Sequence, residues 1–458
     1  MLPTQGGPLR SSLPGAARPL LHAFAGAFTP PTFKRFFTLM LGAVLTTGRR
    51  TITNLLRAVG GLAPGHPSSY HRVFSRRRWS LWSLGHALAD FILRRWVPQD
   101  SVPLAGDDTV DEHRGAKVYG KGRHRDPVRS TKTYTAYRWG HKWVVLAILV
   151  HFPFATRPWA LPVLIALYRS PEWDREHSRR HKTPARLLRQ LTLMLLRWFP
   201  HRHFTLAGDG GYGSHEMACF AHRHRRRLTL VSRFGPSANL YEPPPVVVGK
   251  RKGGRPRTKG AKLPSPEVTV AQTSRTALNV PWYGGGRRDV EVVSGPGQWY
   301  KSGEGLVTVC WVFVHDCTGT HRDDYFFSTD PETTPAAVIE QITGRWSIET
   351  TFQEMRPYLG LETTRGWTEA TVLRLAPCLF GLFSVVALLY DLLPGRIKAR
   401  ARVDWAGKVE TTFSDAIMAV RRWLWVDWVF ANHGFGETFS KLSRPFQEAL
   451  LSALAPSA

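Results

Sequence analysis

The stretch RWSIETTFQEMR, residues 345–356, constrains both the fold and the chemistry of this chain. Read as one helix, it places Arg345, Glu349 and Arg356 at offsets of four and seven residues, so these side chains share one face. A carboxylate held between two guanidinium groups suits a metal-binding acid that must stay ionised beside a phosphodiester, whose phosphates the cations bind. An apolar stripe faces roughly the other way and is expected to be buried: Trp346, Ile348, Phe352 and Met355.

The alternative interpretation is a surface helix with ion pairs four residues apart, and two upstream segments weigh against it. Asp107 and Asp108 follow the apolar segment SVPLAG, and Asp209 follows HFTLAG. Side chains at strand ends project past the edge of a sheet. The Gly-Gly-Tyr-Gly run after Asp209 turns the backbone sharply and leaves room for a bulky ligand. A single aspartate at a strand end is commonly a cap or turn former, but three acidic segments in so basic a chain favour a cluster.

These acids predict a metal-dependent active site. Two strand-end carboxylates and one helical carboxylate provide hard oxygen ligands, which suit Mg²⁺ or Mn²⁺. Two such ions about 4 Å apart activate a water or a 3′-hydroxyl and stabilise the leaving oxygen of an in-line displacement at phosphorus. We therefore expect the catalytic and metal-ligating residues to be Asp107 or Asp108, Asp209 and Glu349.

The composition indicates a polyanionic partner. The 62 Lys and Arg against 34 Asp and Glu give a net charge of +28, which favours nucleic acid over an anionic membrane. The four cysteines have no paired C-x-x-C spacing, which argues against a zinc site or a disulfide framework and favours a reducing cytosol. Residues 372–393 are nearly long enough to span a bilayer, but Arg374, Pro377 and Asp391 interrupt them, so we expect a buried helix and no membrane.

Composition shifts along the chain predict six regions. Residues 30–100 carry helical periodicity, and two helices around Gly60 and Gly61 have the outline of a helix-turn-helix. From about residue 101, strands alternate with helices, which indicates a mixed sheet with helices on its faces. The regions are a partly disordered lead-in rather than an export signal (1–29), a DNA-binding domain (30–100), the two parts of a catalytic domain (101–235 and 306–395), a basic Pro/Gly-rich β insertion (236–305) and a C-terminal helical region for packing or dimerisation (396–458).

A basic run lies inside the predicted insertion. It has almost no apolar residues, so it contributes little folding energy and is expected to lie along a phosphate backbone or in a minor groove. A solvated charged loop is the alternative interpretation. The residues expected to bind DNA here are Lys250, Arg251, Lys252, Arg255, Arg257 and Lys259.

Together the three acidic motifs resemble those of the DDE transposases of bacterial insertion sequences. Within that class the chain is similar to the group with the signature Tyr-x2-Arg-x3-Glu-x6-Lys. Arg345 and Glu349 match it in type and spacing, Arg356 stands at the lysine position and Ile342 stands at the tyrosine position. The likeness covers about residues 100–395. Family members differ in whether threonine follows the first acid directly or after one residue, so Asp107 and Asp108 both remain candidates.

The resemblance implies an α/β fold: a ribonuclease-H-like mixed sheet flanked by helices, with a β-rich insertion and helical N- and C-terminal regions. It implies binding to the terminal inverted repeats as a homodimer on double-stranded DNA, metal-dependent cleavage with two Mg²⁺ or Mn²⁺ ions, and transfer of 3′-hydroxyl ends to target DNA. Arg345 and Arg356 would contact DNA, and the location would be the bacterial cytoplasm, at the nucleoid. The alternatives are a nuclease of this fold without strand transfer and a non-catalytic basic DNA-binding protein.

Overall fold

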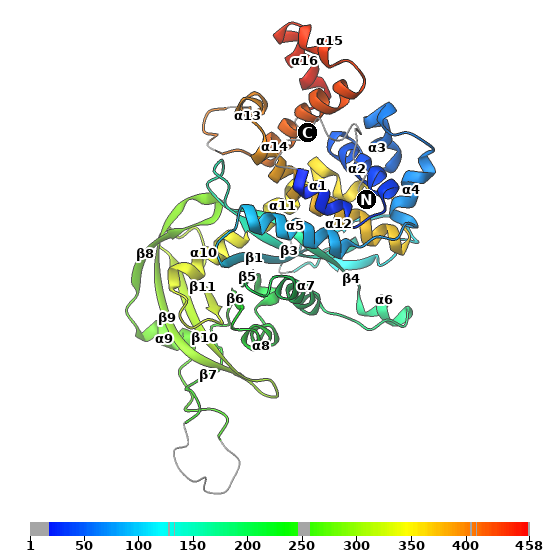
Figure 1. Ribbon diagram of the computed structural model, residues 1–458. Coiled ribbons are helices and arrows are strands. Elements are labelled where there is room, and N and C mark those ends of the chain that lie inside the picture. Colours follow the sequence, from blue (N-terminus) through cyan, green and yellow to red (C-terminus); the bar gives the residue numbers. More distant parts are fainter. Residues whose placement is uncertain are drawn as a thin grey trace.

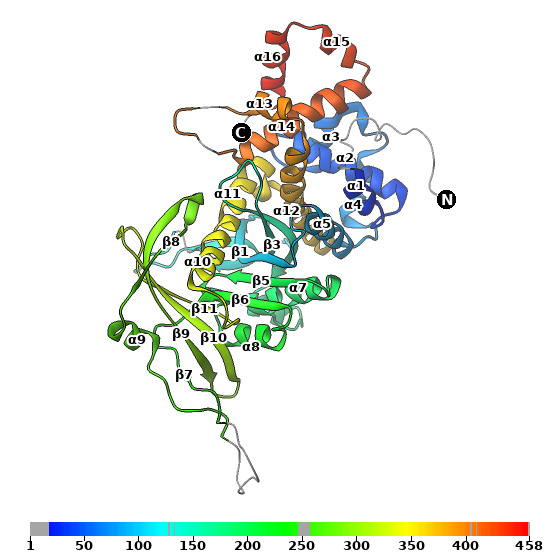
Figure 2. The ribbon, with the colours of Figure 1, turned by 60° about the vertical axis from the view of Figure 1, so that its left-hand side comes forward.

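One large mixed sheet organises the molecule (Figure 1). The computed structural model describes residues 18–126, 129–131, 133–245, 257–403, 405–408 and 410–456. Within them, eleven strands follow the order β2-β3-β1-β5-β6-β11-β10-β9-β7, with β4 paired to β3 and β8 paired to β9. Helices α5 and α12 lie on one side of the first strands, and α7 and α8 lie on the other (Figures 1 and 2).

Five strands form the ribonuclease-H-like part, in the order β4-β3-β1-β5-β6. β1, β3 and β4 pair antiparallel, and β5 and β6 continue the sheet parallel to β1. The predicted fold class is therefore confirmed. The strands are β1 (Ser101–Glu112), β3 (Tyr137–Val150), β4 (Trp159–Tyr168), β5 (His203–Gly208) and β6 (Leu228–Arg233), with the short β2 (Gly122–Arg125) beside β3.

Strand β4 was not among the predicted strands. Its sequence WALPVLIALY is almost wholly apolar because both faces of this edge are covered by helices. Pro162 lies beside a bulge, where the pairing shifts between Leu146 and Ala147 of β3. The helices that pack here are α5 (Leu81–Arg95), α7 (Pro184–Trp198) and α12 (Glu369–Leu392), while α6 (Pro171–Glu176) and α8 (His215–Arg223) follow β4 and β5.

The predicted insertion (236–305) and the two strands that follow it, β10 and β11, extend the same sheet. Strand β11 pairs antiparallel with β6, and β10 and β9 continue from it into a long curved hairpin (Figure 2). Lys250, Arg251, Lys252 and Arg255 lie outside the described residues. Lys259 lies over the rings of Tyr241 and Tyr300, at 4.1 and 4.2 Å. The elements are β7 (Leu240–Tyr241), α9 (Pro266–Gln272), β8 (Thr276–Pro281), η4 (Tyr283–Gly285), β9 (Arg287–Lys301), β10 (Gly305–Asp316) and β11 (Asp324–Ser328).

The N-terminal helices share one apolar core with the sheet and α12. The expected helix–Gly–helix consists of α3 and α4, joined at Gly60, whose φ of 54° suits glycine. The segment expected to be a lead-in contains α1, whose Leu20 is buried. The division into domains stays a prediction. The helices are α1 (Arg18–Ala25), α2 (Pro30–Leu45), α3 (Ile52–Val59), η2 (Gly60–Leu62) and α4 (Pro67–Ser75).

Helix α12 is a core helix. Among the described residues it is the one helix long and apolar enough to cross a membrane, yet 72% of its most apolar window is buried. It packs on β4 and α14, and Ser384 Oγ donates a hydrogen bond to the carbonyl of Pro162 at 2.8 Å. The buried helix predicted for residues 372–393 is therefore present, and Pro377 lies inside it.

A buried arginine joins the C-terminal helices to the rest. Arg421 is fully buried and donates hydrogen bonds to the carbonyls of Val44 and Tyr358, at 2.7 and 3.2 Å. It thereby satisfies carbonyls at the C-terminal ends of α2 and of α11, the helix that carries Glu349. The C-terminal elements are α13 (Gly395–Ala401), α14 (Phe413–Leu424), the π-helix η6 (Trp425–Phe430), α15 (Gly436–Lys441) and α16 (Arg444–Leu454).

Candidate active site

The predicted acids meet where two parallel strands and one helix converge. Gly106 of β1 is in register with Gly208 of β5, so Asp107 and Asp209 follow at the same level on neighbouring strands. Glu349 approaches from α11 (Ser347–Leu359). Arg345, the last residue of α10 (Pro335–Arg345), lies among the three carboxylates. The structure thus brings together one acid from each predicted motif. Asp209 follows the end of β5 as expected, but the prediction that Asp107 and Asp108 follow a strand end was wrong, because β1 continues past them to Glu112, paired with β3.

The helix expected over residues 345–356 is interrupted at its start. α10 ends at Arg345, Trp346 forms a turn, and α11 begins at Ser347. The prediction of a single helix was wrong on this point, and the turn leaves Trp346 37% exposed, whereas the rest of its apolar stripe is buried. The break places Glu349 in the first turn of α11, where the helix dipole stabilises a carboxylate.

Arg345 bridges two of the acids. Its Nη1 lies 2.7 Å from Asp107 Oδ2, and its Nη2 lies 2.9 Å from Glu349 Oε1. Burial alone would lower the pKa of Arg345, but the carboxylates of Asp107 and Glu349 raise it above its ordinary value. The guanidinium therefore stays charged and holds both acids in place.

The environment of Asp107 and Asp209 favours the protonated form of both carboxyl groups. Burial raises the pKa of Asp107 to about 8; Arg345 opposes this shift, and the carboxylates of Asp209 and Asp108 add to it. The pKa of Asp209 is raised as well, again mainly by burial, with Asp108 adding to the shift. Because a divalent cation stabilises ionised carboxylates, this donor set of three carboxylates fits Mg²⁺ or Mn²⁺.

Asp108 has different partners from Asp107. Its Oδ1 lies 2.8 Å from Lys142 Nζ, and its Oδ2 accepts a hydrogen bond from the hydroxyl of Tyr212 at 3.2 Å. Tyr212 belongs to the Gly-Gly-Tyr-Gly turn after Asp209 (η3, Gly210–Tyr212), and burial raises its pKa well above the ordinary value. Asp108 thus ties the first acidic motif to the turn of the second.

The turn after Asp209 also has a local cause. Asp209 Oδ1 accepts a hydrogen bond from the backbone N–H of Gly211 at 3.0 Å and so caps η3. Ser232 Oγ donates to the carbonyls of Gly208 and Asp209, which fixes the end of β5. The sharp turn was predicted, but its use to bring the Tyr212 hydroxyl to Asp108 was not.

Arg356 pairs with a residue other than Glu349. Its Nε lies 3.2 Å from Glu362 Oε1, and its Nη2 donates to Thr109 Oγ1 at 3.0 Å and to the carbonyl of Val110 at 3.3 Å. The expected sandwich of Glu349 between two guanidinium groups is therefore wrong, because Arg356 instead fastens α11 to β1. The DNA contacts of Arg345 and Arg356 stay predictions.

Two functional neighbours were missed from the sequence. Lys142 directly precedes the apolar run 143–150 of β3 and is the cation beside Asp108. A lysine at the start of so apolar a strand is a usable signal, because burying its charge requires a partner. Tyr212 gave no comparable signal, since its role depends on how the turn folds back.

Acids at the same level of two parallel strands and at the start of a facing helix, on a ribonuclease-H-like sheet, define a class of metal-dependent nucleases. The family comparison agrees with this class: the model of the DDE superfamily endonucleases matches residues 23–289, more than half of the chain. The chain belongs to this family. The matched residues include Asp107, Asp108 and Asp209, and they end before Glu349.

Comparisons with solved structures and with curated protein sequences add little to this family assignment. The chain is similar to a piggyBac transposase in a synaptic complex with hairpin DNA, at 10% identity and a TM-score of 0.39, over 93% of this chain and 77% of that one. A likeness this distant supports no inference about the present chain. Curated protein sequences gave no match.

Proposed function

We propose that this protein is a cut-and-paste transposase of a bacterial insertion sequence, acting in the cytoplasm at the nucleoid. The observation that carries the proposal is the meeting of Asp107, Asp209 and Glu349 around Arg345. Membership of the DDE superfamily endonucleases supports the DNA-cutting part. The net charge of +28 supports double-stranded DNA as the partner.

In this proposal Asp107, Asp209 and Glu349 hold one or two Mg²⁺ or Mn²⁺ ions. Such ions, when bound, make a water or 3′-hydroxyl nucleophilic and stabilise charge at phosphorus. Arg345 keeps Asp107 and Glu349 aligned and is placed to donate to a phosphate oxygen. Asp108 acts through Tyr212 and Lys142, holding β1 in place against the turn at the end of β5. Asp107 is therefore the preferred first acid.

Binding of the ends is assigned to the basic surfaces. Residues 30–100 and the basic run with Arg257 and Lys259 would bind the terminal inverted repeats and target DNA, and residues 396–458 would contribute to a homodimer on DNA. These assignments rest on charge and helical character.

The test is a cleavage and strand-transfer assay. Sequencing the DNA on both sides of the gene supplies the inverted repeats, and the purified protein is mixed with these ends, a target plasmid and Mg²⁺. We expect metal-dependent cutting at the repeats and joined products from pre-cut ends. Cutting without joining would indicate a nuclease of the same fold, and DNA binding without cutting at any Mg²⁺ or Mn²⁺ concentration would refute the catalytic proposal.

A further inference from the structure

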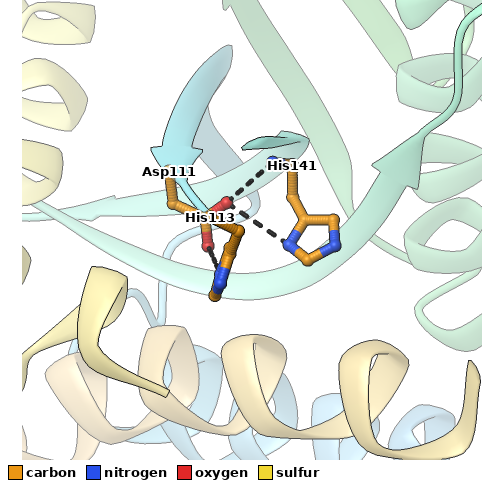
Figure 3. A group of neighbouring side chains, drawn as sticks. All are labelled: Asp111, His113 and His141. Atoms are coloured by element: carbon orange, nitrogen blue, oxygen red, sulfur yellow. Dashed lines mark hydrogen bonds and ion pairs between the residues drawn. The ribbon is translucent and has the colours of Figure 1, made fainter. Parts of the chain in front are cut away.

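A second cluster of metal-ligating side chains lies farther along β1, where it pairs with β3 (Figure 3). Asp111, His113 and His141 each offer one ligand atom, and these atoms all lie within 4.8 Å of one another. The three residues are 0%, 9% and 2% exposed. The cluster is separate from Asp107, because four residues along a strand span about 13 Å.

The backbone brings these side chains together by a close approach of the two strands. A Cβ on Gly140 would lie 1.7 Å from the carbonyl oxygen of Asp111, so β3 passes β1 at a distance that only glycine permits. The next residue, His141, donates its backbone N–H to Asp111 Oδ1 at 3.1 Å. The carboxylate is therefore fixed with one oxygen toward each imidazole.

The hydrogen bonds leave atoms at the centre without partners. His141 Nε2 lies 2.9 Å from the carbonyl of Tyr119, and because a carbonyl only accepts, this nitrogen carries the proton. In the neutral ring, Nδ1 then presents a lone pair to Asp111 Oδ1, 3.5 Å away. Neither His141 Nδ1 nor Asp111 Oδ2 has a hydrogen-bond partner among the described residues. Lone pairs that face one another in a buried site need a metal ion or a proton between them.

Each imidazole nitrogen lies at the distance from its nearer carboxylate oxygen that two ligands of one ion keep. Bonds of about 2.0–2.2 Å to nitrogen and oxygen place tetrahedral ligands roughly 3.3–3.5 Å apart. Asp111 Oδ2 lies 3.3 Å from His113 Nε2, and Asp111 Oδ1 lies 3.5 Å from His141 Nδ1. The Tyr119 carbonyl orients His141 as an outer-shell partner does in zinc sites.

We propose that Asp111, His113 and His141 bind a zinc ion that ties the end of β1 to β3. The inference stands apart from the proposed function, because it concerns none of the acids assigned to cleavage. The expectation of no zinc site rested on cysteine spacing, and this set contains no cysteine. Two imidazoles and one carboxylate favour zinc over the Mg²⁺ assigned to the all-carboxylate site.

The proposed ion would also steady the catalytic strand. Arg356 of α11 donates to Thr109 and to the carbonyl of Val110, directly before Asp111. Fixing Asp111 thus fixes the segment through which α11 is held against β1.

The group formed by His215, Cys219 and Glu304 also offers three metal-ligating side chains and serves as the comparison for the Asp111 cluster. In it, His215 Nδ1 lies 3.1 Å from Glu304 Oε2, and Cys219 Sγ lies 3.4 Å from His215 Nδ1. Its carboxylate already pairs with Lys301 Nζ at 2.7 Å. A cation is therefore present there without a metal, and the Asp111 cluster is the stronger candidate.

The test measures metal content of the full-length protein. The protein is passed through gel filtration in chelator-free buffer with Mg²⁺, and zinc is counted by inductively coupled plasma mass spectrometry. We expect about one zinc ion per chain, as for a single three-ligand site. Asp111→Asn, which keeps the shape of the side chain, should lose most of the zinc, and so should His141→Ala. Co²⁺ added to zinc-depleted protein should give the visible absorption of a tetrahedral site.

Two control variants locate the ion. Cys219→Ser should keep the zinc, because Cys219 belongs to the comparison cluster, and Glu349→Gln should keep it, because Glu349 belongs to the carboxylate site. Circular dichroism establishes that each variant is folded, and addition of Zn²⁺ should raise the Tm of zinc-depleted wild type but not that of Asp111→Asn. Folded wild type with neither zinc nor a Zn²⁺-dependent Tm would overturn the proposal, leaving an Asp–His pair with a protonated imidazole. Zinc retained in Asp111→Asn, or lost in Cys219→Ser, would also overturn it.

Discussion

Asp107 and Asp111 lie four residues apart on the same face of β1, and both are buried, yet their pKa values shift in opposite directions. Burial raises the pKa of Asp107 to about 8, and the nearby carboxylates of Asp209 and Asp108 add to the shift. Burial also acts to raise the pKa of Asp111, but the neighbouring imidazoles of His113 and His141 bring it well below its ordinary value. Neighbours, and not position on the strand, therefore decide the charge of each aspartate.

The different neighbours of Asp107 and Asp111 indicate which cation each site is suited to hold. The Asp107 cluster consists of carboxylates with one guanidinium and is open at Glu349, whose side chain is 39% exposed. A substrate phosphate and an exchangeable hard ion have access there. The Asp111 cluster has two imidazoles and is closed, which suits a retained ion. Substitutions in the two clusters therefore distinguish a chemical role for the first from a structural role for the second.

The largest effect is expected for Glu349→Gln. The amide keeps the shape of the side chain and its hydrogen bond from Arg345 but removes the charge that a metal needs. Mg²⁺-dependent cleavage should be abolished, while affinity for end DNA stays within about threefold of wild type. A cleavage rate above about a tenth of wild type, roughly 1.4 kcal/mol in barrier height, would show that Glu349 is not a metal ligand.

Asn substitutions of the neighbours Asp107 and Asp108 should give unequal losses. Adjacent strand residues point to opposite faces, and Asp107 alone of the two contacts Arg345, whereas Asp108 contacts Tyr212 and Lys142. Asp107→Asn should be inactive, and Asp108→Asn should retain cleavage reduced about 10- to 100-fold through misplacement of the strand ends. The assignment of Asp107 as the first acid fails if Asp108→Asn is inactive and Asp107→Asn cleaves DNA. Tyr212→Phe is the matched control, and its loss of cleavage should be no larger than that of Asp108→Asn.

Much of this site was predictable from the sequence because it depends on local patterns. An apolar segment followed by an acid located Asp107, Asp108 and Asp209, although β1 continues past the first two to Glu112, and helical spacing linked Arg345 to Glu349. The partner of Arg356 was not predictable, because Glu362 and β1 reach it only through tertiary packing. The Asp111–His141 contact joins residues 30 apart and depends on the register of β1 and β3, which no single segment encodes.

The fold, too, has parts that the sequence predicts and parts that depend on tertiary pairing. The mixed sheet followed from alternating strands and helices, and the apolar helix α12 from its composition. Strand β4 was missed because Pro162 lies within it, and a proline is tolerated there only beside a bulge that appears once β3 is paired. The break at Trp346 was missed because its periodicity is compatible with one continuous helix.

A smaller effect is expected in the pH dependence of Mg²⁺ binding. The folded state holds the Asp107 proton up to a pKa of about 8, whereas an unfolded aspartate titrates near 4. Metal-free protein should therefore lose stability as the pH rises from about 4 to about 8, because over this range the folded state binds more protons. Mg²⁺ binds the ionised form and displaces the proton, so its affinity should rise up to about tenfold per pH unit between about pH 6 and 8.

Differential scanning fluorimetry with and without Mg²⁺ at several pH values measures this linkage. The Mg²⁺-induced increase in Tm should grow with pH in wild type and lose that dependence in Asp107→Asn. Asp111→Asn serves as the matched substitution at the other cluster, and it should leave the Mg²⁺ linkage in place. If the linkage disappears in Asp111→Asn instead, the two clusters have been assigned to the wrong ions.

The smallest effect concerns the affinity for DNA, to which neither cluster on β1 is expected to contribute. Arg257 is exposed, whereas Lys259 lies over the rings of Tyr241 and Tyr300, so the two test an exposed and a packed cation of the basic run. Arg257→Ser should lower the slope of log K against log salt by about 0.9, the loss of one phosphate contact. Lys259→Ser should change the slope less, because part of its charge serves the aromatic contacts. Affinities for end DNA and random DNA at several salt concentrations measure both, and the loss should be similar for the two DNAs. An unchanged slope in Arg257→Ser would mean that this cation is solvated, and DNA capture would then be sought among the N-terminal helices.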